Sequence, residues 1–514
     1  MLKRSVIYAC ATASALAVGA MPAAAQQPPD PPSVAEASVA LDHAQEALGV
    51  EGAPSEPSGG VESAPDATVA LNGLAAALPE LRGGERRRAR GLLARPTDGA
   101  ADQFGDGYQA GAPVASVESP HFCVFWVNDP ASADAPNLAD ANGNGRPDYV
   151  EAILAIAEFS YSIEVAPGAM GWAPPKPDVG GCGANPGAHA DIYLKQLGDK
   201  GFFGYESPDP GQGRDRSQYG YVVLDNDYAP SEYGVFLDPL DPAEVTFAHE
   251  FNHLLQQNYD SFQDVWMFES TAVWTEEQVY PEINDYINYV PSFASGAKTP
   301  ITDRKASKGL RIYGSGVWNH WLSSRLGVGV IRRAWEVSDV ARPADYSLAA
   351  YDRAIRDAGG KGFEREFIRF VAATAEWRAG HGSFPDATAY PDVERDGTLR
   401  RGQRKRFELD HTGYRLLKVK SGGRSIELKV DAERGVRAGI ALVARDGDEL
   451  AGSVTEKSKY LPTGGRASVT LSKPGSFERI TAVVVNADGR VKGFRNTDWV
   501  YAKDNQRFTA RLTR

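Results

Sequence analysis

The segment HEFNH, from His249 to His253, has the residue types and the spacing of a catalytic zinc site. Residues four apart in a helix lie on one face about one turn from each other, so both imidazoles can reach one tetrahedral ion at about 2.0–2.1 Å. Glu250 follows the first histidine and can reach a zinc-bound water, from which it would take a proton and pass it to a leaving amine. The segment therefore predicts a hydrolytic Zn²⁺ centre with Glu250 as general base.

A catalytic zinc also needs a third protein ligand and one open position. Glu269 lies sixteen residues after His253, in the segment WMFESTAVWTEE, and we expect it to begin a second helix that runs antiparallel to the first. Glu276 and Glu277 are alternative ligands. Glu276, seven residues after Glu269 on the same helix face, could instead orient a ligand histidine from behind.

The residues before HEFNH predict the start of its helix. Asp241 can cap, Pro242 suits the first helical position, and Glu244 completes a capping box. The helix VTFAHEFNHLLQQNY follows directly. Both histidines would therefore lie well inside a regular helix.

Attack of water on a peptide carbonyl also creates an oxyanion that needs a hydrogen-bond donor. Tyr313 and His320, in RIYGSGVWNHWL, are the candidates. The apolar positions Val317, Trp318 and Trp321 predict a helix packed in the catalytic region, so both candidates could instead be plain core residues.

A second constellation, DANGNGRPDYVE, fits the calcium-loop template D-x-[DN]-x-[DN]-G-x5-E throughout. Gly145 would permit the sharp turn, and a helix would leave the loop. The expected Ca²⁺ ligands are Asp140, Asn142, Asn144, the Arg146 carbonyl, Asp148 and Glu151. The alternative is an Asx-rich turn that caps a helix. Asp225 and Asp227 form a weaker candidate for another oxygen site.

The pattern W-x-x-E-[GS]-x-A-x-[YW] after an HExxH helix, met here from Trp266 to Trp274, resembles the second zinc helix of gluzincin metallopeptidases. The resemblance implies His249, His253 and Glu269 as zinc ligands, with Glu250 as the catalytic base.

A wider set of motifs covers about residues 65–330: HFxVxWV, D-x-N-x-NGxPDYVE, GxxDIYL, GYVVLDNDY, HEFxHxxQ and ExxAVWxEExVYP. Together they resemble a group of poorly characterised exported metalloproteases that is best known from myxobacteria. Members of this group are often followed by β-sandwich modules. The resemblance implies a zinc peptidase and gives no cleavage preference.

The N-terminus has the pattern of a secretory signal peptide. Lys3 and Arg4 precede a small-residue apolar run from Val6 to Met21, and an A-x-A cleavage signal ends at Ala25. We therefore expect residues 1–25 to be removed and the mature chain to be secreted or periplasmic. No other segment has the length and apolarity of a membrane span.

The charge of the chain points away from nucleic acid. Removal of the signal takes away two positive charges and no acid, so the formal net charge of −12 becomes −14. The basic run from Arg86 to Arg90 is local and flanked by Glu80 and Glu85. Such acidity fits an exported protein that binds calcium. We expect a monomer whose partner is a protein or peptide substrate.

Cysteine usage fits export. Cys10 leaves with the signal, so Cys123 and Cys182 remain. An even pair in an exported chain favours a disulfide, and two separate buried thiols are the alternative.

Residues 26–115 precede the globular part. Residues 26–65 are rich in Pro, Ala, Glu and Ser, so we expect them to be disordered. Residues 66–95 predict a short helix interrupted at Pro79. The region is either a propeptide or inhibitory arm, or a linker whose helix packs on the main domain.

The remaining chain predicts an α+β fold. Residues 116–395 would form a zincin-like metallopeptidase domain with a small β-sheet and two zinc-binding helices, helices dominating from 242 to 379. The expected strands are Phe122–Val127, Asp191–Leu194 and Gly220–Asp225. Short alternating strands over residues 405–514 predict an all-β sandwich.

Taken together, these features predict a secreted zinc-dependent endopeptidase. An aminopeptidase is disfavoured because no amine-binding Glu motif stands upstream of His249. The competing class is a non-catalytic, calcium-dependent binding or adhesion protein with a degenerate zincin domain. The intact HExxH segment and the acidic third ligand favour the enzyme.

Overall fold

The structure is a computed structural model of the 514-residue chain. The described residues are 32–50, 67–98, 107–178, 182, 189–201, 203–213, 215–338, 346–379, 384, 386–420, 423–495 and 498–513. The predictions for residues 1–25 and for Cys10 lie outside them.

A five-stranded sheet with the order β1-β2-β3-β5-β4 forms the N-terminal half. Its strands are β1 (Val114–Glu118), β2 (Phe122–Val127), β3 (Ala190–Lys195), β4 (Gly204–Pro208) and β5 (Gly220–Asp225). The central strands β2, β3 and β5 run parallel, and both edge strands run antiparallel to their neighbours. All three predicted strands are confirmed. Their continuous apolar runs suit a sheet that is covered on both faces.

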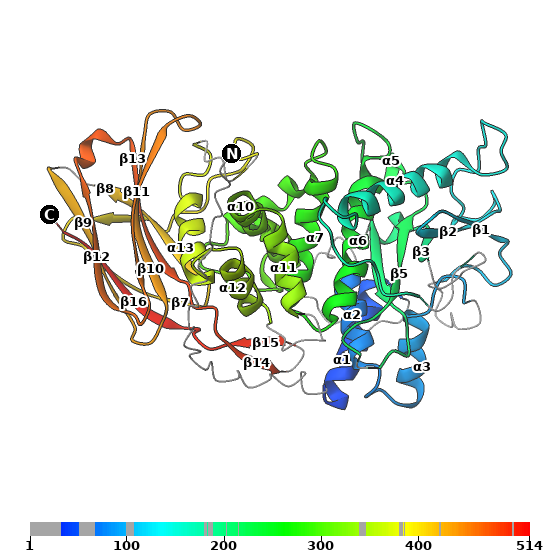
Figure 1. Cartoon of the computed structure of the whole chain (residues 1–514). Coiled ribbons are helices and arrows are strands. Elements are labelled where there is room, and N and C mark those ends of the chain that lie inside the picture. The colour runs from blue at the N-terminus through cyan, green and yellow to red at the C-terminus, as the bar shows by residue number, and fades with distance from the viewer. Residues whose placement is uncertain are drawn as a thin grey trace, which may run out of the picture.

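Side chains alternate between the two faces of this sheet and enter two different cores. Ile192 and Val222 pack beneath α4 (Asp148–Glu164) and α6 (Asp241–Asp260). Tyr193 and Tyr221, next to them in sequence, enter a second core with three N-terminal helices. These are α1 (Val34–Ala47), α2 (Thr68–Ala77) and α3 (Gly83–Leu92), drawn in blue in Figure 1.

The expectation of disorder over residues 26–65 is wrong for α1. This helix begins with a capping box between Ser33 and Glu36, and it buries Leu41, with Leu48 buried at its C-cap. A segment so poor in large apolar side chains cannot form a core by itself, but its narrow Ala and Leu stripe packs against α2 and α3 and joins the core that these helices share with the sheet. Residues 66–95 hold two helices on either side of Pro79 where one interrupted helix was expected.

Helices dominate from α6 to α13, as expected. They are α7 (Val265–Val279), α8 (Val290–Ala294), α9 (Leu310–Gly314), α10 (Gly316–Leu326), α11 (Gly329–Ser338), α12 (Leu348–Asp357) and α13 (Phe363–Thr374), with the short α5 (Pro230–Tyr233) before α6. The cap predicted for α6 is wrong. The helix already includes Asp241, whose carboxylate accepts the backbone N–H of Asp238 instead of capping the helix. Pro242 lies in the first turn, as predicted.

The C-terminal part consists of two packed sheets, with the orders β11-β10-β13-β8-β6 and β12-β9-β16-β7. Their strands are β6 (Thr398–Arg400), β7 (Arg404–Leu409), β8 (Tyr414–Lys420), β9 (Ser425–Ala432), β10 (Ala438–Asp446), β11 (Ser453–Leu461), β12 (Gly465–Ser472), β13 (Arg479–Asn486) and β16 (Gln506–Thr513). The inner faces share one apolar core. The chain therefore has the predicted α+β composition with a β-rich C-terminal region, which begins at β6, before residue 405.

This β-rich region is continuous with the helical region. The outer face of the first sheet, including Tyr414, Val443 and Val483, joins the core beneath α13. A hairpin of β14 (Val491–Arg495) and β15 (Asp498–Tyr501) reaches further, beneath the helices in Figure 1. Its Tyr501 hydroxyl donates to Asp264 at 2.6 Å, directly before α7. The sheets therefore help to fix the start of α7.

Two remaining predictions concern covalent and membrane topology. Cys123 on β2 and Cys182 form a disulfide, with their Cα atoms 6.0 Å apart, so the predicted pairing is confirmed. Among the described residues, no helix combines the length and the apolarity needed to cross a bilayer.

Candidate metal centre

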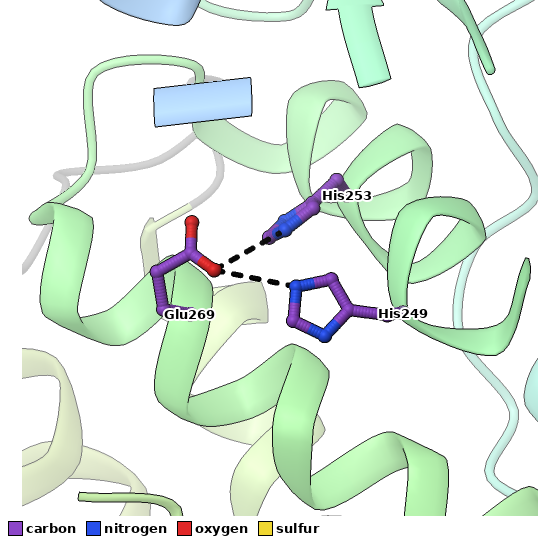
Figure 2. A group of neighbouring side chains, drawn as sticks. All are labelled: His249, His253 and Glu269. Carbon is purple, nitrogen blue, oxygen red and sulfur yellow. Dashed lines mark hydrogen bonds and ion pairs between the residues drawn. The ribbon is translucent and has the colours of Figure 1, made fainter. Parts of the chain in front are cut away.

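His249, His253 and Glu269 converge on one point between α6 and α7 (Figure 2). Glu269 Oε2 lies 3.3 Å from His249 Nε2 and 3.7 Å from His253 Nε2. Ligand atoms bonded at about 2.0–2.1 Å to a tetrahedral zinc are about 3.4 Å apart. The three ligand atoms all lie within 4.8 Å of one another, so these side chains could hold one metal ion such as zinc.

Burial of the cluster explains why these atoms need a common partner. Glu269 and His253 are fully buried, and His249 is 6% exposed. His253 Nε2 has no hydrogen-bond partner among the described residues, although buried polar atoms are normally paired. An orphaned imidazole nitrogen that faces a carboxylate oxygen fits a metal ligand, so the residues present match the ion that the sequence predicts.

The electrostatics of the cluster favour positive charge at its centre. Burial opposes ionisation of Glu269, but the positive charges of His253 and His249 and the contact with His249 Nε2 lower its pKa to about 2. Burial likewise lowers the pKa of His253, but Glu269 outweighs it and raises this pKa to about 9. The carboxylate therefore attracts a cation to the place where both imidazoles point.

Glu276 holds His249 from behind. Its Oε1 lies 2.6 Å from His249 Nδ1, so that nitrogen donates and Nε2 is directed at Glu269. This is the orienting contact that its position seven residues after Glu269 suggests. A carboxylate behind a ligand histidine fixes the tautomer and makes the ligating nitrogen more basic. Glu276 is thus placed as an orienting residue, while Glu277 does not belong to the converging group.

A buried relay that sequence reasoning missed holds His253. Gln256 Oε1 lies 2.8 Å from His253 Nδ1, while its Nε2 donates to Asn252 Oδ1 and to the Phe268 carbonyl. Asn252 Nδ2 in turn donates to Glu164 on α4 at 2.9 Å. The spacing of Asn252, His253 and Gln256 on one helix could have indicated it, since residues three and four apart are neighbours.

Glu250, the expected general base, is 1% exposed and lies on α6 between the two histidines. Its Oε2 accepts a hydrogen bond of 2.9 Å from the hydroxyl of Thr68, the first residue of α2. Nothing in the sequence near Thr68 indicates this contact, because the two residues are 182 positions apart. Only the packing of the N-terminal helices brings them together.

The two oxyanion candidates differ in position. Tyr313 on α9 is buried, and its ring lies parallel to that of His249 at 6.0 Å between centroids. His320 on α10 packs against Tyr286 instead, at 4.4 Å, and burial lowers its pKa to about 3. Tyr313 is therefore beside the cluster, whereas the contacts of His320 are those of a core residue.

The predicted calcium loop closes on itself. Both Asp140 oxygens accept backbone N–H groups of the loop, and Gly145 has a φ of 86°. Asn142 and Asn144 direct their amide groups at the two oxygens of Glu151, at 2.9 and 2.6 Å. Asp148 accepts the Ala141 N–H and begins α4, so the helix leaves the loop as the template requires.

The weaker oxygen site at Asp225 and Asp227 is organised as a turn. Asp227 and Asp225 gather with Glu232, but both Asp225 oxygens accept backbone N–H groups, among them those of Leu197 and Tyr228. The buried carboxylate is thus satisfied by the chain itself.

Comparison with known proteins does not assign a family. No family model and no curated protein matches the chain. Among solved structures, a protein titled Family 16 Carbohydrate Binding Module-2 is 13% identical over 21% of this chain and 77% of that chain, with a TM-score of 0.14. A family GH115 4-O-methyl-α-glucuronidase with specificity for decorated arabinogalactans is 10% identical over 64% and 52%, with a TM-score of 0.12. Likenesses this weak bear on neither fold nor function.

Proposed function

We propose that this protein is a secreted zinc-dependent peptidase, and that its catalytic domain is zincin-like. One observation carries the proposal: the ligand atoms of His249, His253 and Glu269 lie within 4.8 Å of one another, close enough to share one zinc ion, and Glu250 is on the same helix as both histidines. Three protein ligands leave one position for chemistry, which distinguishes catalytic zinc sites from structural ones.

Zinc bound by these three residues would polarise a carbonyl and lower the pKa of a water molecule. The Glu250 carboxylate takes the proton of the attacking water and then passes it to the amine that leaves. Tyr313, beside His249, donates a hydrogen bond to the oxygen that gains negative charge. Glu276 and Gln256 keep the Nε2 atoms of both histidines directed at the centre.

The calcium loop has a structural role in this proposal. Asp140, Asn142, Asn144, the Arg146 carbonyl, Asp148 and Glu151 would hold Ca²⁺ at the start of α4. Amide groups of asparagine present oxygen after a half-turn about their terminal bond, because the two orientations are nearly equal in shape. The ion would tie α4, which packs against α6, to the preceding loop.

The proposed location is outside the cytoplasm, in agreement with the disulfide between Cys123 and Cys182. We propose an endopeptidase acting as a monomer on protein or peptide substrates. The non-catalytic binding protein is the competing function, and it requires neither bound zinc nor Glu250.

Zinc analysis combined with digestion of a peptide library tests the proposal. The purified chain should hold one zinc per molecule and cleave peptides in a reaction that a zinc chelator stops. Glu250→Gln should keep the zinc, because Glu250 is not a ligand, and should lose turnover. Absence of bound zinc, or full turnover by Glu250→Gln, would contradict the proposal. The matched control is Asp238→Asn, which also replaces one carboxylate by an amide but lies in the turn before α6, outside the metal centre.

A further inference from the structure

The first turn of α2 lies against the proposed catalytic base. Thr68 is fully buried, and its hydroxyl donates to Glu250 Oε2 at 2.9 Å. The same hydroxyl accepts the backbone N–H of Glu206 on β4, also at 2.9 Å. Thr68 therefore bridges the proposed catalytic base and the strand β4.

The second of these groups belongs to the edge of the sheet. β4 pairs with β5 on one side only, and an extended peptide commonly binds an exposed edge strand through its backbone. A substrate carbonyl could accept the Glu206 N–H, but Thr68 takes that hydrogen bond. All five residues of β4 are buried, and α2 packs against them.

Further contacts hold α2 in this place. Asn72, one turn after Thr68, accepts a hydrogen bond from Gln257 on α6. Leu71 and Leu74 enter the apolar core that also contains Tyr205 of β4. The helix thus contacts both the zinc-binding helix and the sheet edge.

Arg95, which follows α3 in the chain, also anchors the N-terminal helices. The Arg95 guanidinium is bound by three buried carboxylates, with Asp191 at 3.0 Å and Asp178 and Asp209 at 2.5 Å. Burial opposes its charge, yet Asp209 above all raises the pKa of Arg95 above its usual value. Removing either side of such an arrangement is costly, because it leaves buried charges unpaired. The anchor keeps α2 close to the site.

We propose that the N-terminal helices α1 to α3 are an inhibitory arm, and that Thr68 closes the active site of the full chain. The proposal rests on the peptidase function. Glu250 is 1% exposed and accepts the hydrogen bond of Thr68, so in this proposal the first turn of α2 has to move before a peptide reaches the base. Movement of this first turn uncovers Glu250 and the edge of β4, while the ion pairs of Arg95 keep the N-terminal helices attached to the rest of the chain.

The test is Thr68→Asp in the full chain. It places a second carboxylate beside Glu250 in a buried position, where like charges repel and desolvation is costly. Peptide cleavage should rise by ~10-fold or more, since activity follows the fraction of open molecules. Hydrogen exchange supplies a readout independent of activity: the amides of α2 and of Glu206 should lose protection, and bound zinc should stay at one per chain.

Two further variants make the result specific. Thr68→Val keeps the shape but removes the hydroxyl, so it should raise cleavage by roughly fivefold, the equivalent of one hydrogen bond. This variant also serves if Thr68→Asp does not fold. Val39→Asp adds an acid to the exposed face of α1 and should behave like the unaltered chain.

Higher cleavage by both Thr68 variants, with no change in Val39→Asp, supports the inhibitory arm. Loss of α2 protection without any rise in cleavage, in a chain that already cleaves peptides, overturns it and leaves the peptidase standing. If no variant cleaves peptides although zinc is bound and α2 is released, the peptidase function has failed and the inference fails with it.

Discussion

The proposed zinc cluster and the proposed calcium loop are both recognisable by spacing, but the chain builds them differently. The proposed zinc ligands come from two packed helices and are buried, and each histidine is held from behind by Glu276 or Gln256. The calcium loop is a single exposed segment whose side chains bind its own backbone and one another. Its ligands therefore have to exchange partners when an ion binds.

This difference predicts how each site responds to change. Ligands that are already oriented lose little conformational freedom on binding, so affinity depends on few atoms and is high. In the loop, Asn142 and Asn144 must turn their amides away from Glu151, so binding is weaker and spread over several ligands. Zinc should survive dialysis that removes calcium.

The largest effect is expected from His253→Ala. It removes a fully buried ligand whose Nε2 has no hydrogen-bond partner among the described residues. Zinc affinity and kcat/KM should fall by more than the ~100-fold that loss of an outer partner of a ligand typically costs. Zinc titration and peptide hydrolysis measure both. All of these variants keep the proposed inhibitory arm, α1 to α3. The kcat/KM of each variant is therefore expressed as a ratio to that of the unaltered chain. Retention of zinc by this variant would break the assignment of the site.

Tyr313→Phe should come next, with kcat lower by about 10²–10³ and zinc affinity unchanged, because it removes a donor needed only when the oxyanion forms. His320→Phe is the matched control, since His320 is buried against Tyr286. Its kcat should stay within about twofold of the unaltered chain, because the interaction lost is not with the reacting groups. The reverse pattern would exchange the roles of the two residues.

Glu276→Gln should weaken zinc binding by about 10–100-fold, because a neutral amide replaces the carboxylate that accepts the His249 Nδ1–H. Zinc competition with a chromogenic chelator measures the change. Glu277→Gln, one residue further along α7, is the control and should bind zinc as the unaltered chain does. If both variants lost the same zinc affinity, Glu276 would act through the negative charge of this region and not through its hydrogen bond with His249.

The smallest effect is expected at the loop. Glu151→Gln should abolish the stabilisation by calcium, a loss of on the order of a few degrees in Tm, while zinc content stays the same. Thermal unfolding with and without a calcium chelator reads this difference. If the unaltered chain shows no calcium-dependent Tm, the segment is an Asx-rich turn, and the comparison between two metal sites no longer holds.

Local sequence patterns were sufficient to predict many of the strands and helices and the candidate metal ligands. The positions of the strands β2, β3 and β5 followed from their apolar runs, and the helix spacing of His249 and His253 predicted that both imidazoles project from one face. The disulfide followed from the count of cysteines in a chain that was expected to be exported. Each of these depends on residues that are close in sequence or on very few possible partners.

Contacts between residues far apart in the sequence could not be predicted from it. The helix α1 is stable because α2 and α3, which share a core with the sheet, accept its narrow apolar stripe, which composition alone could not show. The contact between Thr68 and Glu250, and the bond from Tyr501 to Asp264, join positions 182 and 237 residues apart. Even the cap of α6 depended on a competing turn at Asp238.

Anomalous X-ray scattering at the zinc edge, from crystals of the full chain, tests the central claim most directly. The account predicts one peak per chain, about 2.0–2.2 Å from His249 Nε2, His253 Nε2 and a Glu269 oxygen. A zinc peak elsewhere, or none in protein purified without chelator, would contradict it.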